Sequence, residues 1–303
     1  MDIRWLQDFL AVAETQNFTR AARLRNVSQA AFSRRIKALE SWAGKALIDR
    51  TSSPPSLTPD GELFRERASE IARQIADARL IGTAVERRKQ IRLAMPHSLA
   101  TGRLPIWWAS WSKEVGEEVE CSVLTGDVGD TFSALMTGDV DILIRYWFSN
   151  LPATLPEGDY EHFEIGQERF SPYASPRLIS EQDGNFALPK GSRPPLLMYT
   201  RSATFAQIQN QIIENASEKL AGKIIFESES ASVLRAMAMA GHGVAWLPEC
   251  VAKEAPPGTL YRIENPEWSA DLTIVAYRDQ QTAFPALTRL WSLLSRSAQT
   301  RTA

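Results

Sequence analysis

Cysteine and histidine are scarce in this chain of 303 residues, which holds two cysteines and three histidines. Cys121 and Cys250 are far apart, and His97, His162 and His242 follow no metal-ligand spacing. A disulfide framework and a structural metal site are therefore excluded, since both need several such residues at short, regular intervals. We expect both cysteines to be small core residues, with the sensing of an oxidant by one of them as the alternative.

Long apolar runs are absent as well. No stretch of about 18 uncharged apolar residues occurs, and the first residues, MDIRWLQDFLAVAE, lack the pattern of a secretory signal. The chain has no glycine-rich phosphate loop, and the neighbours His97 and Ser98 cannot form a nucleophile and base pair within one site. These absences argue against a membrane protein, an exported protein and many enzymes. They predict a cytoplasmic protein without a cofactor or a metal.

Charge is shared unevenly along the chain, whose formal net charge is −2. Lys and Arg outnumber Asp and Glu by 16 to 11 over residues 1–90, whereas the rest has 18 basic and 25 acidic residues. With 44% hydrophobic and 23% charged residues, the chain is long enough for two or three packed domains. The basic N-terminal part is the one expected to meet a polyanion.

Three short helices are predicted near the N-terminus. Apolar residues recur at helical spacing over residues 4–14, and the polar residues that follow end that helix. Asn17 can cap a second helix, and Ser28 can cap a third helix after a tight turn. Two short helices joined by a tight turn predict a helix-turn-helix.

The third helix is predicted to bury one face and to expose the opposite one. The buried face carries apolar residues spaced by four, three and four positions: Phe32, Ile36, Leu39 and Ala43. The opposite side carries Gln29, Ala30, Ser33, Arg34 and Lys37. Gln can pair with adenine, Arg with guanine and Ser with either, while Ala permits close approach to a thymine methyl. We expect Arg35 and Lys37 to contact phosphates; an ordinary helix with a solvated basic face is the alternative.

The segment ALIDRTSSPPSLTPDGELF indicates a wing. Leu47 and Ile48 favour a short strand, two prolines stiffen the following loop, and Leu57 begins the return. Arg50 lies at the base of this wing. It could enter the minor groove or contact a phosphate, or it could form a surface ion pair with Asp49 or Glu40.

A long helix is predicted from Pro59 to about residue 88, capped by Thr58 and with acidic residues in its first turn. Apolar residues follow a heptad pattern along it: Phe64, Ala68, Ile71, Ile75, Ala78, Gly82 and Val85. Such a seam favours a dimerisation and linker helix that pairs with another helix. A long helix that lies on its own protein is the alternative.

Residues 1–88 resemble the winged helix-turn-helix and linker helix of LysR-type transcriptional regulators. The resemblance rests on LQDFLAVAETQNFTRAARLRNVSQAAFSRRIKALESWAGKALIDR, followed by LTPDGELF. It implies a homodimer or homotetramer that binds an inverted repeat in a double-stranded DNA operator. It divides the chain into a DNA-binding domain (1–58), a linker helix (59–88) and an effector-binding domain (91–303). By position, the DNA-binding residues are Ser28, Gln29, Ala30, Ser33, Arg34, Lys37 and Arg50.

The rest of the chain alternates between predicted strands and helices, which favours an α/β fold with mainly parallel sheets. Strands are expected at 91–95, 119–124, 140–146, 169–175, 195–200, 223–228 and 243–248. Helices are expected at 103–111, 131–138, 205–220, 230–241 and 285–295. The resemblance implies two lobes around a cleft, as in periplasmic solute-binding proteins. Lobe I is placed at about 91–163 and 268–303, and lobe II at about 164–267.

Polar residues follow three of these strands, where α/β proteins bind ligands and where helix N-termini favour an anionic effector. The resemblance makes Ser98 and Thr101 the first candidates. It places Arg145 near the crossing between the lobes, and Ala245 or Trp246 on the wall of the cleft. The candidate effector-binding residues are His97, Ser98, Leu99, Thr101, Arg145, Thr200, Arg201, Ser202, Ser230 and Ala245. Ser and Thr side chains also cap helices in proteins without a ligand. For each Ser and Thr candidate, helix capping is therefore the alternative to effector binding.

The stretches AMPHSLATGRLP, LLMYTRS and GVAWLPE are similar to hypochlorite-responsive members of the family. Oxidation of Met or Cys is therefore an alternative signal to a reversibly bound small molecule. An enzyme would need convergent catalytic groups, and a solute-binding protein would need an export signal. The sequence favours a DNA-binding transcriptional regulator controlled by a small-molecule or oxidant signal.

Overall fold

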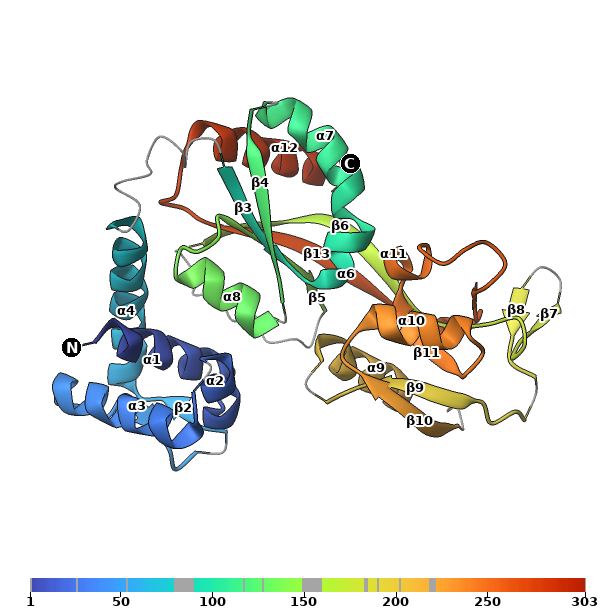
Figure 1. Cartoon of the computed structure of the whole chain (residues 1–303), viewed down its shortest axis with the longest axis horizontal. Helices are drawn as coiled ribbons and strands as arrows, with labels where there is room; N and C mark the ends of the chain where they lie inside the picture. Colours follow the sequence, from blue (N-terminus) through green and yellow to red (C-terminus); the bar gives the residue numbers. More distant parts are fainter. Residues whose placement is uncertain are drawn as a thin grey trace.

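The structure is a computed structural model that describes residues 2–25, 27–52, 54–78, 90–116, 118–126, 128–148, 160–182, 185–189, 191–201, 203–217 and 222–302. Within these residues no helix is both long and apolar enough to cross a membrane. Figure 1 shows a helical N-terminal unit beside the first of two α/β lobes.

The N-terminal unit contains the predicted helix-turn-helix. Its helices are α1 (Ile3–Thr15), α2 (Phe18–Leu24) and α3 (Gln29–Ala43). Asn17 Oδ1 accepts hydrogen bonds from the backbone N–H groups of Thr19 and Arg20, both at 3.0 Å. Ser28 Oγ accepts one from the N–H of Ala31 at 3.3 Å. Both predicted N-caps are confirmed, and they set the start of each helix.

The wing follows α3 and consists of two short antiparallel strands, β1 (Ile48–Asp49) and β2 (Ser56–Leu57). The hydroxyl of Thr58 then caps the next helix, as predicted, by accepting the N–H of Gly61 at 3.0 Å. Gly61 lies against the wing, and a Cβ at this position would be 2.0 Å from the carbonyl oxygen of Leu47. A side chain here would force the helix away from the wing.

Helix α4 (Pro59–Ala78) packs on the helix-turn-helix. The ring of Phe64 meets Phe9 of α1 edge to face, with ring centroids 5.2 Å apart, and Ala68 is completely buried. These two seam positions therefore do not face a partner helix, contrary to the prediction from the heptad pattern, because α1 covers them. The predicted continuation over residues 79–88 lies outside the described residues.

Lobe I forms around three parallel strands. Its elements are β3 (Gln90–Met95), α6 (His97–Gly102), α7 (Leu104–Val115), β4 (Glu120–Thr125), α8 (Val128–Met136) and β5 (Ile142–Trp147). Helix α8 packs on one face of the sheet, and α7 packs on the other together with the C-terminal helix α12 (Pro285–Thr302).

Lobe II has a second set of parallel strands. Its elements are β7 (Ser180–Gln182), β8 (Asn185–Ala187), β9 (Pro195–Tyr199), α9 (Thr204–Asn215), β10 (Lys223–Ser228), α10 (Ala231–Met239), β11 (Val244–Pro248), α11 (Glu249–Ala252), β12 (Tyr261–Arg262) and the 3-10 helix η1 (Pro266–Trp268). Strand β9 pairs in parallel with both β10 and β11.

Two long strands, β6 (Tyr160–Ala174) and β13 (Ala270–Asp279), join the lobes. They pair antiparallel with each other, β13 also pairs with β5, and the end of β6 pairs with β11. In the described part of the chain nine strands thus form one sheet in the order β10-β9-β11-β6-β13-β5-β3-β4, with β12 beside β6. The expectation of mainly parallel sheets holds within each lobe and is wrong for the strands that join them.

The apolar core consists of two clusters. The larger one runs through both lobes on the side of α7 and α12. The second one combines residues of α1 to α4 with residues of α8, β5 and β13. The DNA-binding unit and lobe I therefore share one apolar cluster within a single chain.

Candidate DNA-binding surface and effector region

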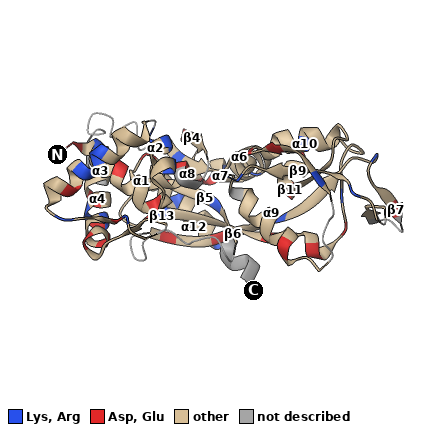
Figure 2. Ribbon diagram, turned by 90° about the horizontal axis from the view of Figure 1, so that it is seen from below, with Lys and Arg blue, Asp and Glu red and all other residues tan. Residues whose placement is uncertain are grey.

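Helix α3 exposes the face that was predicted to read DNA. Phe32, Ile36 and Leu39 are completely buried. The predicted DNA-binding residues on this helix and at its cap are exposed or half-buried: Ser28, Gln29, Ala30, Ser33, Arg34 and Lys37. Figure 2 shows basic residues along α3. The polar face is thus free to enter a groove, because the helix is held by its opposite side.

The buried Asp8 of α1 fixes the arrangement of the three helices. Its side chain is completely inaccessible, and its two oxygens accept hydrogen bonds from Arg25 Nε at 2.9 Å and Arg35 Nη1 at 3.3 Å. Arg25 also donates to the side chain of Gln7 at 2.6 Å. The expectation that Arg35 holds a phosphate is corrected here, because its guanidinium serves a buried ion pair.

Arg50 is held at the base of the wing. Its Nη2 atom lies 2.6 Å from Glu40 Oε2, and its guanidinium lies over the ring of Phe18 at 5.6 Å from the centroid. The other oxygen of Glu40 accepts the N–H groups of Leu47 and Ile48 at 3.1 and 3.2 Å. The surface ion pair with Glu40 considered from the sequence is therefore present. The side chain of Arg50 is still 37% exposed, which leaves it accessible to a phosphate.

The junction between the lobes contains a buried polar cluster around Ser98, Tyr146 and Cys250. The Tyr146 hydroxyl lies 3.3 Å from Ser98 Oγ and 3.7 Å from Cys250 Sγ. The thiol of Cys250 donates to the Ser98 carbonyl oxygen at 3.5 Å. This brings together the turn after β3, a strand of lobe I and the start of α11. Tyr146 was missed from the sequence, since it lies within an apolar strand.

Glu168 links the two lobes at the same junction. Its completely buried carboxylate accepts hydrogen bonds from Arg103 Nε and from the backbone N–H of Cys250, both at 2.8 Å. Sequence reasoning missed Glu168, because β6 carries further charged residues at Glu161, Glu164 and Arg169 and nothing local distinguishes the buried one. Burial, followed by the charge of Glu168, raises the pKa of the Cys250 thiol to about 12.

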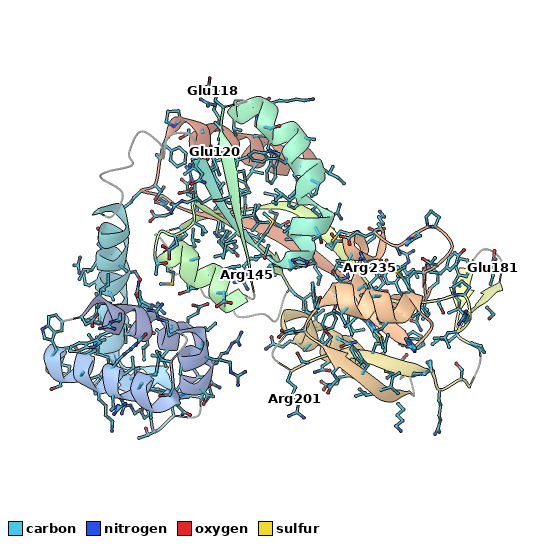
Figure 3. The ribbon with its side chains drawn as sticks, viewed as in Figure 1. Glu118, Glu120, Arg145, Glu181, Arg201 and Arg235 are labelled. Carbon is cyan, nitrogen blue, oxygen red and sulfur yellow. The ribbon has the colours of Figure 1, made fainter. Side chains whose placement is uncertain are left out.

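Lobe II contributes the ends of two parallel strands. The N–H of Thr200, after β9, donates to the carbonyl oxygen of Ser228, at the end of β10, at 3.2 Å. Ser230 caps α10 by accepting the N–H of Val233 at 3.5 Å. Arg201 is exposed on lobe II (Figure 3), and Ser202 lies outside the described residues.

Two buried side chains of lobe II have unpaired polar atoms. The Tyr199 hydroxyl and Gln209 Nε2 are buried without a hydrogen-bond partner among the described residues. Gln209 is held in place because its Oε1 accepts the N–H of Tyr199 at 3.0 Å. Tyr199 packs against the rings of Phe170 and Phe205. Buried donors without partners are costly, and they mark a place where a polar ligand atom would be stabilised.

The remaining candidates lie elsewhere. His97 and Thr101 are exposed on α6, and the Thr101 hydroxyl donates to the carbonyl oxygen of His97 at 3.1 Å. Leu99 and Ala245 are completely buried in the core. Arg145 points to the opposite face of the sheet, toward α8, where its neighbour two positions away on β5 belongs to the second apolar cluster. The expectation that Arg145 joins the effector residues is corrected by this orientation.

The comparisons with known proteins agree on one family. The family described as LysR substrate binding domain matches residues 84–299. The family described as bacterial regulatory helix-turn-helix protein, lysR family, matches residues 3–62. Together the two matches span nearly the whole chain.

Similar proteins are regulators. HTH-type transcriptional regulator YjiE of Escherichia coli (strain K12) is 30% identical over 294 residues, which cover 96% of this chain and 93% of YjiE. The structure of Vibrio fischeri DarR in complex with DNA is 30% identical with a TM-score of 0.56, covering 97% of this chain and 98% of DarR. The hypochlorite-specific LysR-type regulator HypT from Salmonella typhimurium is 28% identical with a TM-score of 0.56, covering 98% of this chain and 99% of HypT. The chain belongs to the LysR family of DNA-binding transcriptional regulators, with a helix-turn-helix in front of an effector-binding domain.

Proposed function

We propose that the exposed face of α3 reads the operator and that the wing holds its backbone. Gln29, Ala30, Ser33 and Arg34 contact base edges, while Lys37 contacts a phosphate. Ser28 caps the helix and directs its N-terminus toward the DNA, and Arg50 leaves Glu40 to contact the neighbouring backbone. The observation that supports this assignment is the contrast between the two faces of α3, one completely buried and one exposed.

The same proposal includes an effector site where the two lobes meet. We assign Ser98, Thr200 and Ser230 to it, joined by Tyr199 and Gln209. The unpaired Tyr199 hydroxyl and Gln209 amide are both able to donate, which favours an effector with hydrogen-bond acceptors, such as a carboxylate. The domain boundaries follow the same division, with DNA binding in residues 1–58, a linker helix in 59–88 and effector binding in 91–303.

Reversible binding is favoured over oxidation as the signal. Thiol oxidation proceeds through the thiolate, and burial raises the pKa of Cys121 to about 11 and that of Cys250, also next to Glu168, to about 12. Both thiols are therefore protonated at neutral pH. Met95, Met136 and Met198 are buried as well, which limits access of an oxidant to them, whereas Met237 and Met239 are half-buried. The name of HypT keeps hypochlorite as the second candidate signal.

We propose that the chain acts as a regulator and catalyses no reaction. It acts in the cytoplasm, where a chromosomal operator is accessible. Within the described residues, no group of three His, Cys, Asp or Glu side chains could hold a metal ion. Members of the LysR family bind operators and effectors and oligomerise, so its partners are double-stranded DNA, a small anionic effector and further copies of itself in a homodimer or homotetramer.

The DNA part of the proposal is tested with duplex DNA from the promoter region of its own gene. We expect tight binding to an inverted repeat that weakens steeply as the salt concentration rises, because contacts to phosphates release counterions. Binding that is absent, or that does not respond to salt, would contradict it.

The effector part is tested by thermal shift of the full chain with a panel of small carboxylates. A ligand that raises the melting temperature of the wild type, but not that of a Tyr199→Phe or Ser98→Ala variant, supports the assigned site. Hypochlorite treatment followed by mass spectrometry tests the second candidate. If operator binding changes only after a Met or Cys residue is oxidised, the signal is an oxidant and not a reversibly bound ligand.

A further inference from the structure

Helix α8 of lobe I is buried over more than half of its circumference. Phe132, Ala134, Leu135 and Met136 are each at most 7% exposed, and the polar Thr131 is 2% exposed. Successive helix residues point about 100° apart, so these residues cover more than half of the circumference, while the exposed Asp130 and the half-buried Ser133 mark the remaining side. Helix α8 contacts β3 and β5 of its own lobe, and it contacts α1 and α4 of the DNA-binding unit. It is therefore enclosed between the effector lobe and the DNA-binding unit (Figure 1).

Helix α1 is enclosed in the same way. The five consecutive residues from Asp8 to Val12 are each at most 3% exposed, although a helix on the surface of a small unit would bury one stripe alone. In Figures 1 and 2, α1 lies between α3 and α8. Lobe I thus contacts the DNA-binding unit on the side away from the recognition helix, and the polar face of α3 stays free for DNA.

A charged residue lies within this contact. Arg145 on β5 is 4% exposed, and its Nε donates to the carbonyl oxygen of Tyr146 at 3.4 Å. Burial lowers the pKa of its guanidinium, while the nearby Tyr277 of β13 and Glu14 of α1 act in the opposite direction. Glu14 is thus a carboxylate of the DNA-binding unit whose charge acts on Arg145 of lobe I.

We propose that α8 and Arg145 form a docking surface for the DNA-binding unit of the same chain, and that docking fixes α3 relative to the effector domain. A change in lobe I would then reach α3 directly through α1, in parallel with any path through α4.

The residues between lobe I and the DNA-binding unit favour a contact that can form and release. The shared apolar cluster favours docking, because release would expose it to water. Arg145 favours release, because its guanidinium regains hydration once the DNA-binding unit leaves. Two opposing contributions leave a small free-energy difference between docked and released states, which an effector or DNA can shift.

Charge reversal in the full chain tests the docking. We would measure amide hydrogen exchange of α1 and α8 in Glu14→Arg, in Arg145→Glu and in the double variant with both changes. Each single change places like charges together, and we expect exchange in both helices to accelerate about tenfold. The double variant restores opposite charges and should return to within about threefold of the wild type. Glu181→Arg, the same change on the exposed β7 strand far from the contact (Figure 3), should leave both helices unchanged.

Two outcomes would overturn the proposal: unchanged protection of both helices in the single variants, or a double variant that exchanges as fast as the singles. Because Arg145→Glu could unfold lobe I by itself, Glu14→Gln serves as the milder change, and exchange of β9 and β11 reports on folding of the rest. Fast exchange throughout both charge-reversed single variants, with normal protection in the double variant and in Glu181→Arg, would still support the interaction between positions 14 and 145, since only opposite charges restore it.

The consequence for DNA is measured separately. We would compare affinities for inverted repeats whose spacer is changed by one base pair at a time, since each base pair rotates one half-site relative to the other. The wild type should bind tightly to few spacer lengths. When the spacer is altered, the affinity of Glu14→Gln should fall by a factor at least about three times smaller than that of the wild type. Binding of both proteins to a single half-site should be the same. Equal spacer dependence of the two proteins would show that docking does not orient α3. Failure of both proteins to bind any repeat would instead contradict the DNA-binding assignment of α3.

Discussion

At the scale of single residues, Asp8 decides which arginines are left for DNA. Helical periodicity predicts correctly that Phe32 and Ile36 are buried and that Arg34 and Lys37 are exposed. It cannot predict that Arg35 bonds to a carboxylate 27 positions earlier, because that contact depends on how two helices cross. The one available signal was an aspartate among the apolar positions of the first helix.

We expect Asp8→Ala to lower the free energy of unfolding by about 2 kcal/mol, because it leaves two arginines without their buried partner. The arginine side chains are each 27% exposed, so water limits the loss. Urea denaturation followed by circular dichroism measures it. Asp271→Ala, which removes an exposed ion pair with Arg169, is the matched control and should change stability by less than about 0.5 kcal/mol. Equal effects of the two changes would contradict a structural role for Asp8.

Arg34 and Lys37 lie on the same exposed face but should act differently on DNA. Arg34→Ala should cost about 1 to 3 kcal/mol of binding and relax the preference at one base pair, because a guanine contact is lost. Lys37→Ala should weaken all sequences alike and reduce the salt dependence by about one counterion. Binding to a set of single-base operator variants at several salt concentrations separates the two. If neither change affects binding, α3 is not the recognition helix. Arg193→Ala removes a charge at an exposed site on lobe II and is the control, which should bind DNA like the wild type.

At the scale of helices and strands, the elements with strong signals were predictable. N-caps and apolar spacing located α1 to α4, and short apolar runs located β3, β5, β9 and β11. Strand β13 was missed, although the apolar run at 272–277 follows the Asn265-Pro266 turn signal in the sequence. Strand β6 was predicted too short, since its first half carries charged residues that face solvent at the crossing between the lobes.

The neighbours Leu63 and Phe64 on α4 should separate folding from assembly. Phe64 packs on Phe9, whereas Leu63 is 65% exposed. We expect Phe64→Ala to cost about 2 kcal/mol of stability, because an aromatic contact inside the unit is lost. Leu63→Glu should leave stability within about 0.5 kcal/mol and weaken self-association, because an exposed apolar side chain on a linker helix is a contact for a second copy. Light scattering and urea denaturation of both variants measure the two effects. Unchanged association in Leu63→Glu would exclude this face of α4 from the oligomer.

At the scale of the whole molecule, the sequence predicted two α/β lobes but not how they are joined. The pairing of β6 with β13, of β6 with β11 and of β13 with β5 depends on contacts between segments more than 70 positions apart, as between Tyr173 and Ala245. The docking of lobe I on α1 escaped prediction for the same reason. Local patterns determine which face of an element is apolar, and they leave open which distant element covers it.

Within the part of the chain that the structure describes, the single sheet ends at β4 and β10, and both edge strands carry exposed apolar side chains. Val123 and Leu124 on β4 are 36% and 42% exposed, and Ile224 and Ile225 on β10 are 52% and 48% exposed. Successive strand residues point to opposite faces, so both faces are uncovered at each end of the sheet. Exposed apolar edges are contacts for another chain, and this family oligomerises. We predict that Leu124→Asp and Ile225→Asp each weaken self-association.

Mixing the two variants shows which edges meet. If β4 of one copy packs against β10 of the other, a symmetric dimer has two such contacts, and a mixed dimer of Leu124→Asp with Ile225→Asp places both substitutions in one contact. The second contact is then entirely native, so the mixture should associate more tightly than either variant alone. If β4 instead meets β4, the mixed pair has one Asp in that contact, so the mixture should associate with a strength between those of the two variants. Sedimentation velocity of each variant and of the equimolar mixture distinguishes the two arrangements, and unchanged association of both single variants would exclude the edges altogether.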